Sequence, residues 1–147
     1  MNHLFIKLHY NYLAWLINPE KYGVVPVSGN LINTCANIQP HLPDCVVDKV
    51  YIEDPFVVKE DVGKLIRIQR TLGALLWLIF QKYNTTPILI SQADARMKLF
   101  GTLKIGKDLA VTEAQALLKG LNSKDIGIVA TMCVYDALVL RDYIGGN

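Results

Sequence analysis

The sequence predicts an α/β protein built on a mixed β-sheet. Three short runs rich in apolar and β-branched residues open the chain, at positions 3–8, 13–18 and 22–27, and such runs are typical of strands. From position 61 onward, segments with helical spacing alternate with a short apolar run at 87–92. Strands followed by alternating helices and strands indicate an α/β sandwich, in which helices cover a mixed sheet.

The opening runs follow one another closely and suggest an antiparallel meander. A turn signal, Ser-Gly-Asn at 28–30, separates the meander from a further short run at 31–37. After a loop that contains two prolines, KVYIEDPF at 49–56 begins as a continuous apolar run. Such a run predicts a strand covered on both faces, and this one ends in two adjacent acids, Glu53 and Asp54.

The longest predicted element is a helix at 61–83. Its apolar side chains recur at steps of three and four residues, which is the period of an amphipathic helix. The first half carries Lys64, Arg67 and Arg70, whereas the second half is apolar nearly all round. We therefore expect the second half to be buried on several sides and to be a candidate dimer contact. The aromatic side chains expected in the core, and not as platforms for DNA bases, are Trp15, Trp77, Phe80 and Phe100.

The C-terminal part of the chain predicts two further helices. After the strand at 87–92 comes a short segment with Arg96 and Lys98, then a glycine-punctuated basic loop at 101–107. Helical spacing follows at 111–121 and again at 127–144, where two glycines provide a common stop.

Length and composition fit one domain covering residues 1–147, which is long enough to bury a sizeable core. The three cysteines are widely spaced, which favours reduced thiols in a cytoplasmic protein. The N-terminus lacks the pattern of a signal peptide, and the most apolar tract, at 71–80, is too short to cross a bilayer. We expect an intracellular protein with no membrane partner and no small-molecule substrate.

The formal net charge of +2 hides an asymmetry along the chain. Residues 1–58 hold three basic and five acidic side chains, residues 59–107 nine and three, and residues 108–147 three and five, for net charges of −2, +6 and −2. The basic middle third is either a solvated helix face with a few loop lysines or a surface that meets phosphate.

This succession of elements resembles the RuvC-type Holliday junction resolvases, which have the ribonuclease H-like fold. The resemblance runs along nearly the whole chain and is sharpest at VYIEDPF, IQRTLGALLWLIF and VYDALVL. It implies a five-stranded mixed sheet, with antiparallel opening strands followed by parallel strands, and helices on both faces. It also implies a homodimer that binds four-way junction DNA, because a two-fold junction is matched by a two-fold protein.

The resemblance carries a catalytic site over to this chain only in part. The family cuts DNA with two divalent ions about 4 Å apart, held by one Asp from the first strand, one Glu from the fourth strand and two acids of the last helix. Glu53 and Asp136 match two of these acids, but Lys7 and Cys133 stand at the other two positions. We expect Lys7, Glu53 and Asp136 to form an internal cluster, in which the ammonium neutralises the two carboxylates.

Several functional readings stay open at this point. The main one is a junction-binding homologue whose nuclease activity is weak or lost, with no tightly bound cofactor; if it is active, Mg²⁺ would bind Glu53 and Asp136. A second is a non-catalytic structural or protein-interaction module, and a third is an active nuclease with rearranged ligands, in which Asp54 or a neighbour compensates. Lys7 could also lie on the solvent side of an edge strand if the alignment is shifted. The candidate phosphate-binding residues are Arg67, Arg70, Arg96, Lys98, Lys104 and Lys107.

Overall fold

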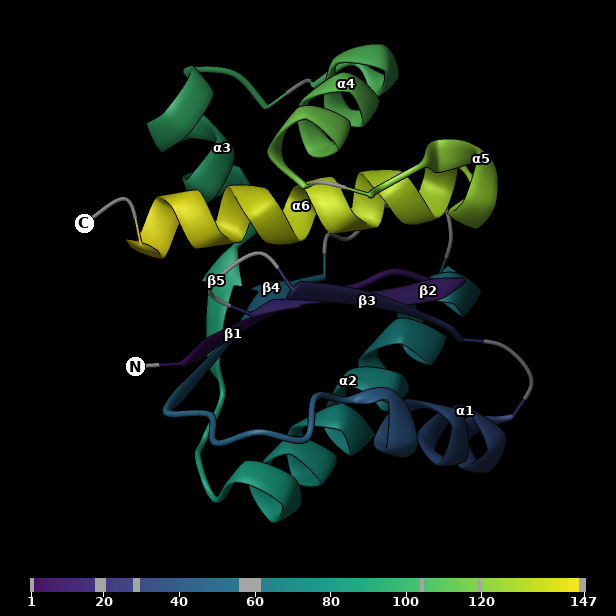
Figure 1. The fold of residues 1–147 in the computed structure, drawn as a ribbon. Coiled ribbons are helices and arrows are strands. Elements are labelled where there is room, and N and C mark those ends of the chain that lie inside the picture. Colours follow the sequence, from purple (N-terminus) through teal and green to yellow (C-terminus); the bar gives the residue numbers. More distant parts are fainter. Residues whose placement is uncertain are drawn as a thin grey trace.

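The computed structural model has a five-stranded mixed β-sheet with strand order β3-β2-β1-β4-β5 (Figure 1). Strands β1, β2 and β3 form an antiparallel meander, while β4 pairs parallel to both β1 and β5. The fold class predicted from the sequence is therefore confirmed. The strands are β1 (His3–Leu8), β2 (Tyr12–Ile17), β3 (Lys21–Pro26), β4 (Lys49–Asp54) and β5 (Ile88–Ser91). The structure describes residues 2–17, 21–27, 30–55, 62–103, 105–118 and 120–145.

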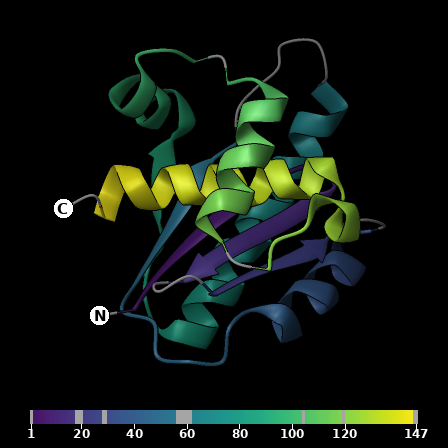
Figure 2. The same ribbon diagram turned by 45° about the horizontal axis from the view of Figure 1, so that its top comes forward.

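Helices cover both faces of the sheet (Figures 1 and 2). On one face lie α1 (Leu31–Ile38), a 3₁₀ turn (Gln39–His41) and the long α2 (Val62–Tyr83). The other face is covered by α6 (Ile128–Gly145), and further helices pack on the outside of α6 (Figure 1). These outer helices are α3 (Gln92–Phe100), α4 (Lys107–Leu117) and the short α5 (Ser123–Ile126).

Alternation along the central strands divides the core into two layers. Leu4, Ile6 and Leu8 of β1 are buried with the α2 side chains, whereas Phe5, between them, is buried against α6. Successive residues of a strand point to opposite faces of the sheet. A central strand covered on both faces is therefore apolar at almost every position, as the sequence of β1 is.

The run at 31–37, for which the sequence predicted no element, is a helix. Asn30 caps α1 through its side-chain oxygen, which accepts a hydrogen bond from the Asn33 backbone N–H. Thr34 and Ile38, four residues apart, form its buried face. A run this short satisfies strand and helix patterns about equally, and the cap decides between them.

Two other expectations are corrected on the helical side. The segment around Arg96 and Lys98 is a helix, α3, capped by Ser91 and ended by Gly101 in a left-handed conformation with φ 69°. Helix α4 begins at Lys107, four residues before the predicted start at 111. No helix among the described residues is long and apolar enough to cross a membrane.

The second half of α2 is less buried than predicted. Trp77 is 60% exposed, and Phe80 and Phe100 are 42% and 43% exposed, whereas Trp15 lies in the core as expected, 6% exposed. Only one side of α2 meets the sheet, through Leu72, Leu75 and Ile79. The exposed rings of Trp77 and Phe80 stack on each other with centroids 6.0 Å apart.

Candidate functional site

The candidate site lies at the carboxyl ends of the parallel strands β1 and β4. Phe5 of β1 pairs with Tyr51 of β4, and both are buried on the face that α6 covers. Two residues further along each strand come Lys7 and Glu53, which therefore point to this same face. Helix α6, which covers this face, places Asp136 above them.

The three side chains meet, as the sequence predicted. The Lys7 Nζ donates to Glu53 Oε1 at 2.5 Å and lies 3.4 Å from Asp136 Oδ2. All three residues are buried, with exposed fractions of 8%, 3% and 8%. Lys7 thus lies under α6 and not on the solvent side of an edge strand.

The structure adds a fourth member to this cluster, Arg96 of α3. Its Nη2 donates to Asp136 Oδ1 at 2.9 Å, and its Nη1 donates to the Leu103 carbonyl at 3.1 Å. Its Nε is buried and has no hydrogen-bond partner among the described residues. The charge cluster, as we call Lys7, Glu53, Arg96 and Asp136, therefore balances two cations against two carboxylates. From the sequence, Arg96 was predicted to contact phosphate. Its place in the cluster could have been inferred only from the need of two buried acids facing one ammonium for a second cation.

Burial and charge act in opposite directions on the pKa values of the cluster. Burial disfavours the ammonium of Lys7, but Glu53 and Asp136 outweigh burial, so the pKa of Lys7 is raised. Burial raises the pKa of Glu53 to about 7, although Lys7 partly opposes this shift. Lys7 is therefore charged at neutral pH, whereas Glu53 takes up a proton as the pH falls below about 7.

Cys133 borders the cluster on α6, one turn before Asp136. It is 2% exposed, and burial raises the pKa of its thiol to about 12, so the thiol is neutral and contributes no negative charge at neutral pH. Asp54 ends strand β4 and its side chain is exposed. Because it follows Glu53 directly in the strand, it points to the opposite face.

The residues present do not fit a pair of divalent ions. Mg²⁺ requires oxygen ligands in near-octahedral geometry, and the cluster offers two carboxylates with an ammonium between them. Within the described ranges, no group of three His, Cys, Asp or Glu side chains is arranged to hold a metal.

The remaining candidate phosphate contacts are spread over three helices. Arg67 on α2 donates from Nη1 to the Tyr10 hydroxyl at 3.1 Å, and Lys98 on α3 lies 4.9 Å from the centroid of the Tyr143 ring. Arg70 and Lys107 are exposed, and Lys104 lies outside the described residues.

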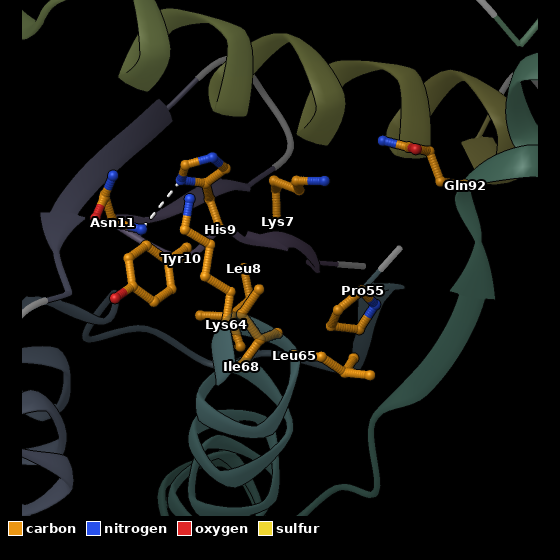
Figure 3. Close-up of a pocket in the computed structure, with 10 residues that line it drawn as sticks. All are labelled: Lys7, Leu8, His9, Tyr10, Asn11, Pro55, Lys64, Leu65, Ile68 and Gln92. Atoms are coloured by element: carbon orange, nitrogen blue, oxygen red, sulfur yellow. Dashed lines mark hydrogen bonds between the residues drawn. The ribbon is translucent and has the colours of Figure 1, made fainter. Parts of the chain in front are cut away.

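Beside the charge cluster, a cleft of about 380 Å³ opens between the end of β1 and the start of α2 (Figure 3). Sequence reasoning did not identify the cleft, because its walls come from segments far apart in the chain. We call it the β1–α2 cleft; its principal lining residues are Lys7, His9, Tyr10, Lys64, Leu65 and Ile68.

Comparison with solved structures shows a RuvC-like fold. Thermus thermophilus RuvC superposes with a TM-score of 0.60 and 13% sequence identity, over 99% of this chain and 97% of that one. T. thermophilus RuvC in complex with a Holliday junction substrate gives a TM-score of 0.62 and 14% identity, over 92% of each chain. At this level of identity the likeness establishes the fold. No protein-family profile matches the sequence, and no curated protein is significantly similar to it.

Proposed function

We propose that this chain is a RuvC-like protein that binds branched DNA and has weak or no nuclease activity. The observation that carries the proposal is the Lys7 ammonium, 2.5 Å from Glu53 and 3.4 Å from Asp136. In a two-metal nuclease, divalent ions neutralise the carboxylates and activate the attacking water. An ammonium supplies the first of these effects but has no ligand position for water. The chain therefore keeps the fold and the carboxylates Glu53 and Asp136, while its nuclease activity is weak or absent.

DNA binding does not depend on metal ions. It rests mainly on basic side chains that meet phosphates, and residues 59–107 carry the net positive charge of this chain. The T. thermophilus neighbour is described in complex with a Holliday junction substrate, which supports the same class of ligand here. We propose Arg70, Lys98 and Lys107 as principal phosphate contacts, because their side chains lie on exposed positions of three helices.

We further propose that the DNA-binding form is a homodimer formed through α2. The exposed Trp77 and Phe80 are neighbours on its outer surface, and a groove of about 420 Å³ runs beside them toward β5. Gly73, one turn before Trp77, leaves open space above the helix. In a two-fold contact, the Trp77 ring of one copy would fill the space at Gly73 of the other.

The test compares binding and cleavage of a four-way junction by the chain as given and by a Lys7→Asp, Cys133→Asp double variant. We expect the natural chain to bind the junction more tightly than linear duplex, in a salt-dependent manner, and to cut it poorly in Mg²⁺ or Mn²⁺. The double variant restores four carboxylates, so we expect it to gain metal-dependent cutting. The matched control is Lys7→Asn, Cys133→Asn, which has the same shapes without the charges and should not cut.

Efficient cutting by the natural chain, abolished by Glu53→Gln, would contradict the loss of catalysis. Equal affinity for junction and duplex would contradict branched-DNA recognition.

A second candidate function is a protein-interaction module that reuses the fold. The exposed Trp77–Phe80 stack favours it, because exposed apolar patches mark interaction surfaces. It predicts no DNA binding, together with loss of a partner protein when Trp77 is replaced by serine.

A further inference from the structure

The β1–α2 cleft lies where α/β proteins bind ligands. It opens beyond the carboxyl ends of the sheet's parallel strands, since Lys7 and Leu8 end β1, Pro55 follows β4 and Gln92 follows β5. Crevices at this position are the common ligand sites of open α/β sheets. A volume of about 380 Å³ falls in the size range of small-molecule sites.

The lining of the cleft is partly apolar and partly cationic (Figure 3). Leu8, Pro55, Leu65 and Ile68 gather together on the side toward α2. The charged groups of the lining are Lys7 and Lys64, and none of the described lining residues is acidic. The charge of Lys7 is balanced by Glu53 and Asp136, whereas Lys64 is exposed at the mouth of the cleft and can approach an anion.

One wall of the cleft is held in place by charge–aromatic contacts. Tyr10, in the turn between β1 and β2, has the Lys64 Nζ 5.2 Å and the Arg67 guanidinium carbon 4.9 Å from its ring centroid. Arg67 also donates to the Tyr10 hydroxyl at 3.1 Å. Contacts of this kind stabilise the position of an aromatic ring.

Hydrogen-bonding groups of defined polarity complete the lining. The Asn11 backbone N–H donates to His9 Nδ1 at 3.0 Å, so the neutral His9 ring carries its proton on Nε2. Burial and the nearby Lys7 lower the pKa of His9, which keeps the ring neutral at pH 7. The amide of Gln92 lies at the opposite end of the cleft and offers both a donor and an acceptor (Figure 3).

From these observations we propose that the β1–α2 cleft receives one unstacked nucleotide, with its base against Leu65 and Ile68 and its phosphate near Lys64. A nucleotide combines an apolar ring, hydrogen-bonding edges and one anionic group, which matches the lining. A purely apolar ligand would leave Lys64 and Gln92 unused, and a small inorganic anion would leave the apolar side empty. The inference deepens the proposed function and rests on it for the source of the nucleotide, an unpaired residue at a DNA branch point.

The first experiment uses two four-way junctions that differ in one base. One carries a single unpaired thymidine at the branch point, and the other carries an abasic residue there, with the same number of phosphates. We expect the natural chain to bind the thymidine junction about tenfold more tightly, the gain expected from burying on the order of 55 Å² of apolar base surface. Equal affinity of the folded protein for the two junctions would overturn the inference.

The variants fill the cleft without changing its charge. Leu65→Trp occupies the apolar side and should abolish the tenfold preference. The matched control is Ile66→Trp, the same substitution one residue along α2 at a position that is 45% exposed and does not line the cleft; it should keep the preference. A thermal melt confirms that both variants are folded. Full preference in a folded Leu65→Trp variant would contradict the assignment of the base to this cleft.

A second experiment separates this inference from DNA binding as a whole. The natural chain is titrated with free thymidine 5′-monophosphate, and separately with inorganic phosphate, while the methyl signals of Leu65 and Ile68 are followed by NMR. The nucleotide should shift these signals and phosphate alone should not. If the chain binds neither junction but the nucleotide shifts the methyl signals, the proposed function fails and the cleft remains a site for free nucleotides. Unmoved signals together with equal junction affinities would overturn the site itself.

Discussion

Replacing Lys7 by methionine tests whether the ammonium stabilises the charge cluster. Methionine keeps an unbranched chain but removes the charge from between Glu53 and Asp136. At the observed distances of 2.5 and 3.4 Å, the gross attractions are about 7 and 5 kcal/mol in an effective dielectric of about 20. Desolvation of the ammonium offsets several kcal/mol of this, and breaking such buried pairs costs about 3–5 kcal/mol in measured cases.

We expect a loss of about 3 kcal/mol in the free energy of unfolding at pH 8, at the lower end of that range, because Arg96 still pairs with Asp136. For a chain of this length, the loss corresponds to a decrease of about 6–12 °C in melting temperature. The control is Lys49→Met, at an exposed position of β4, which should change stability by less than about 0.5 kcal/mol.

The loss of stability in the Lys7→Met variant should depend on pH, and the raised pKa of Glu53 decides the direction of that dependence. Its pKa is raised from an ordinary value of 4.5 to about 7, so the folded state takes up a proton in this range and stability falls as pH rises through it. Because Lys7 lowers the pKa of Glu53, the Lys7→Met variant should have a still higher Glu53 pKa. Its stability should therefore decrease with rising pH over a wider range than that of the unaltered chain. Lys7 stays charged over this whole pH range. Because its pKa is raised above 10.5, the stability that the ammonium contributes is fully present below pH 10.5.

Urea unfolding of both proteins at pH 8 and pH 5 provides the measurement. The difference between them should be smaller at pH 5, where Glu53 is protonated in the variant and the loss is limited to the hydrogen bond between Lys7 and Glu53 and the attraction between Lys7 and Asp136. A difference below about 1 kcal/mol at pH 8, or one that is larger at pH 5 than at pH 8, would refute the role assigned to Lys7.

Four further substitutions test other parts of the molecule. Gly23→Ala places a Cβ 2.4 Å from the Trp15 indole, so we expect a loss of about 1–3 kcal/mol in urea unfolding; unchanged stability would show that the ring can move. Arg70→Gln and Lys107→Gln should each weaken junction binding and reduce the slope of log affinity against log salt by about 1. An unchanged slope would exclude that residue as a phosphate contact. Trp77→Ser should shift the chain toward monomer in sedimentation at micromolar concentration, and an unaltered mass would argue against the α2 contact.

Some features of this protein could be read from single segments. The strands β1, β2 and β4 and the helix α2 were predicted nearly residue by residue, because their side chains repeat at the period of one element. Helix α1 was not predicted, because its run is short and the cap at Asn30 was not recognised. The exposure of Trp77 was also missed, because an apolar sequence does not reveal how many neighbours a helix has.

The sequence by itself determined which residues stand at the ends of strands and on the last helix. The resemblance to resolvases then implied that Lys7, Glu53 and Asp136 belong to one site, while a solvent-facing Lys7 stayed open until the structure placed it between the two carboxylates. Only the tertiary structure decided that Arg96 joins the same site and that a cleft opens beside it. The physical reason is that contacts between α3, α6 and the β1–β2 turn depend on how separate elements pack, and no repeat within one segment encodes that packing.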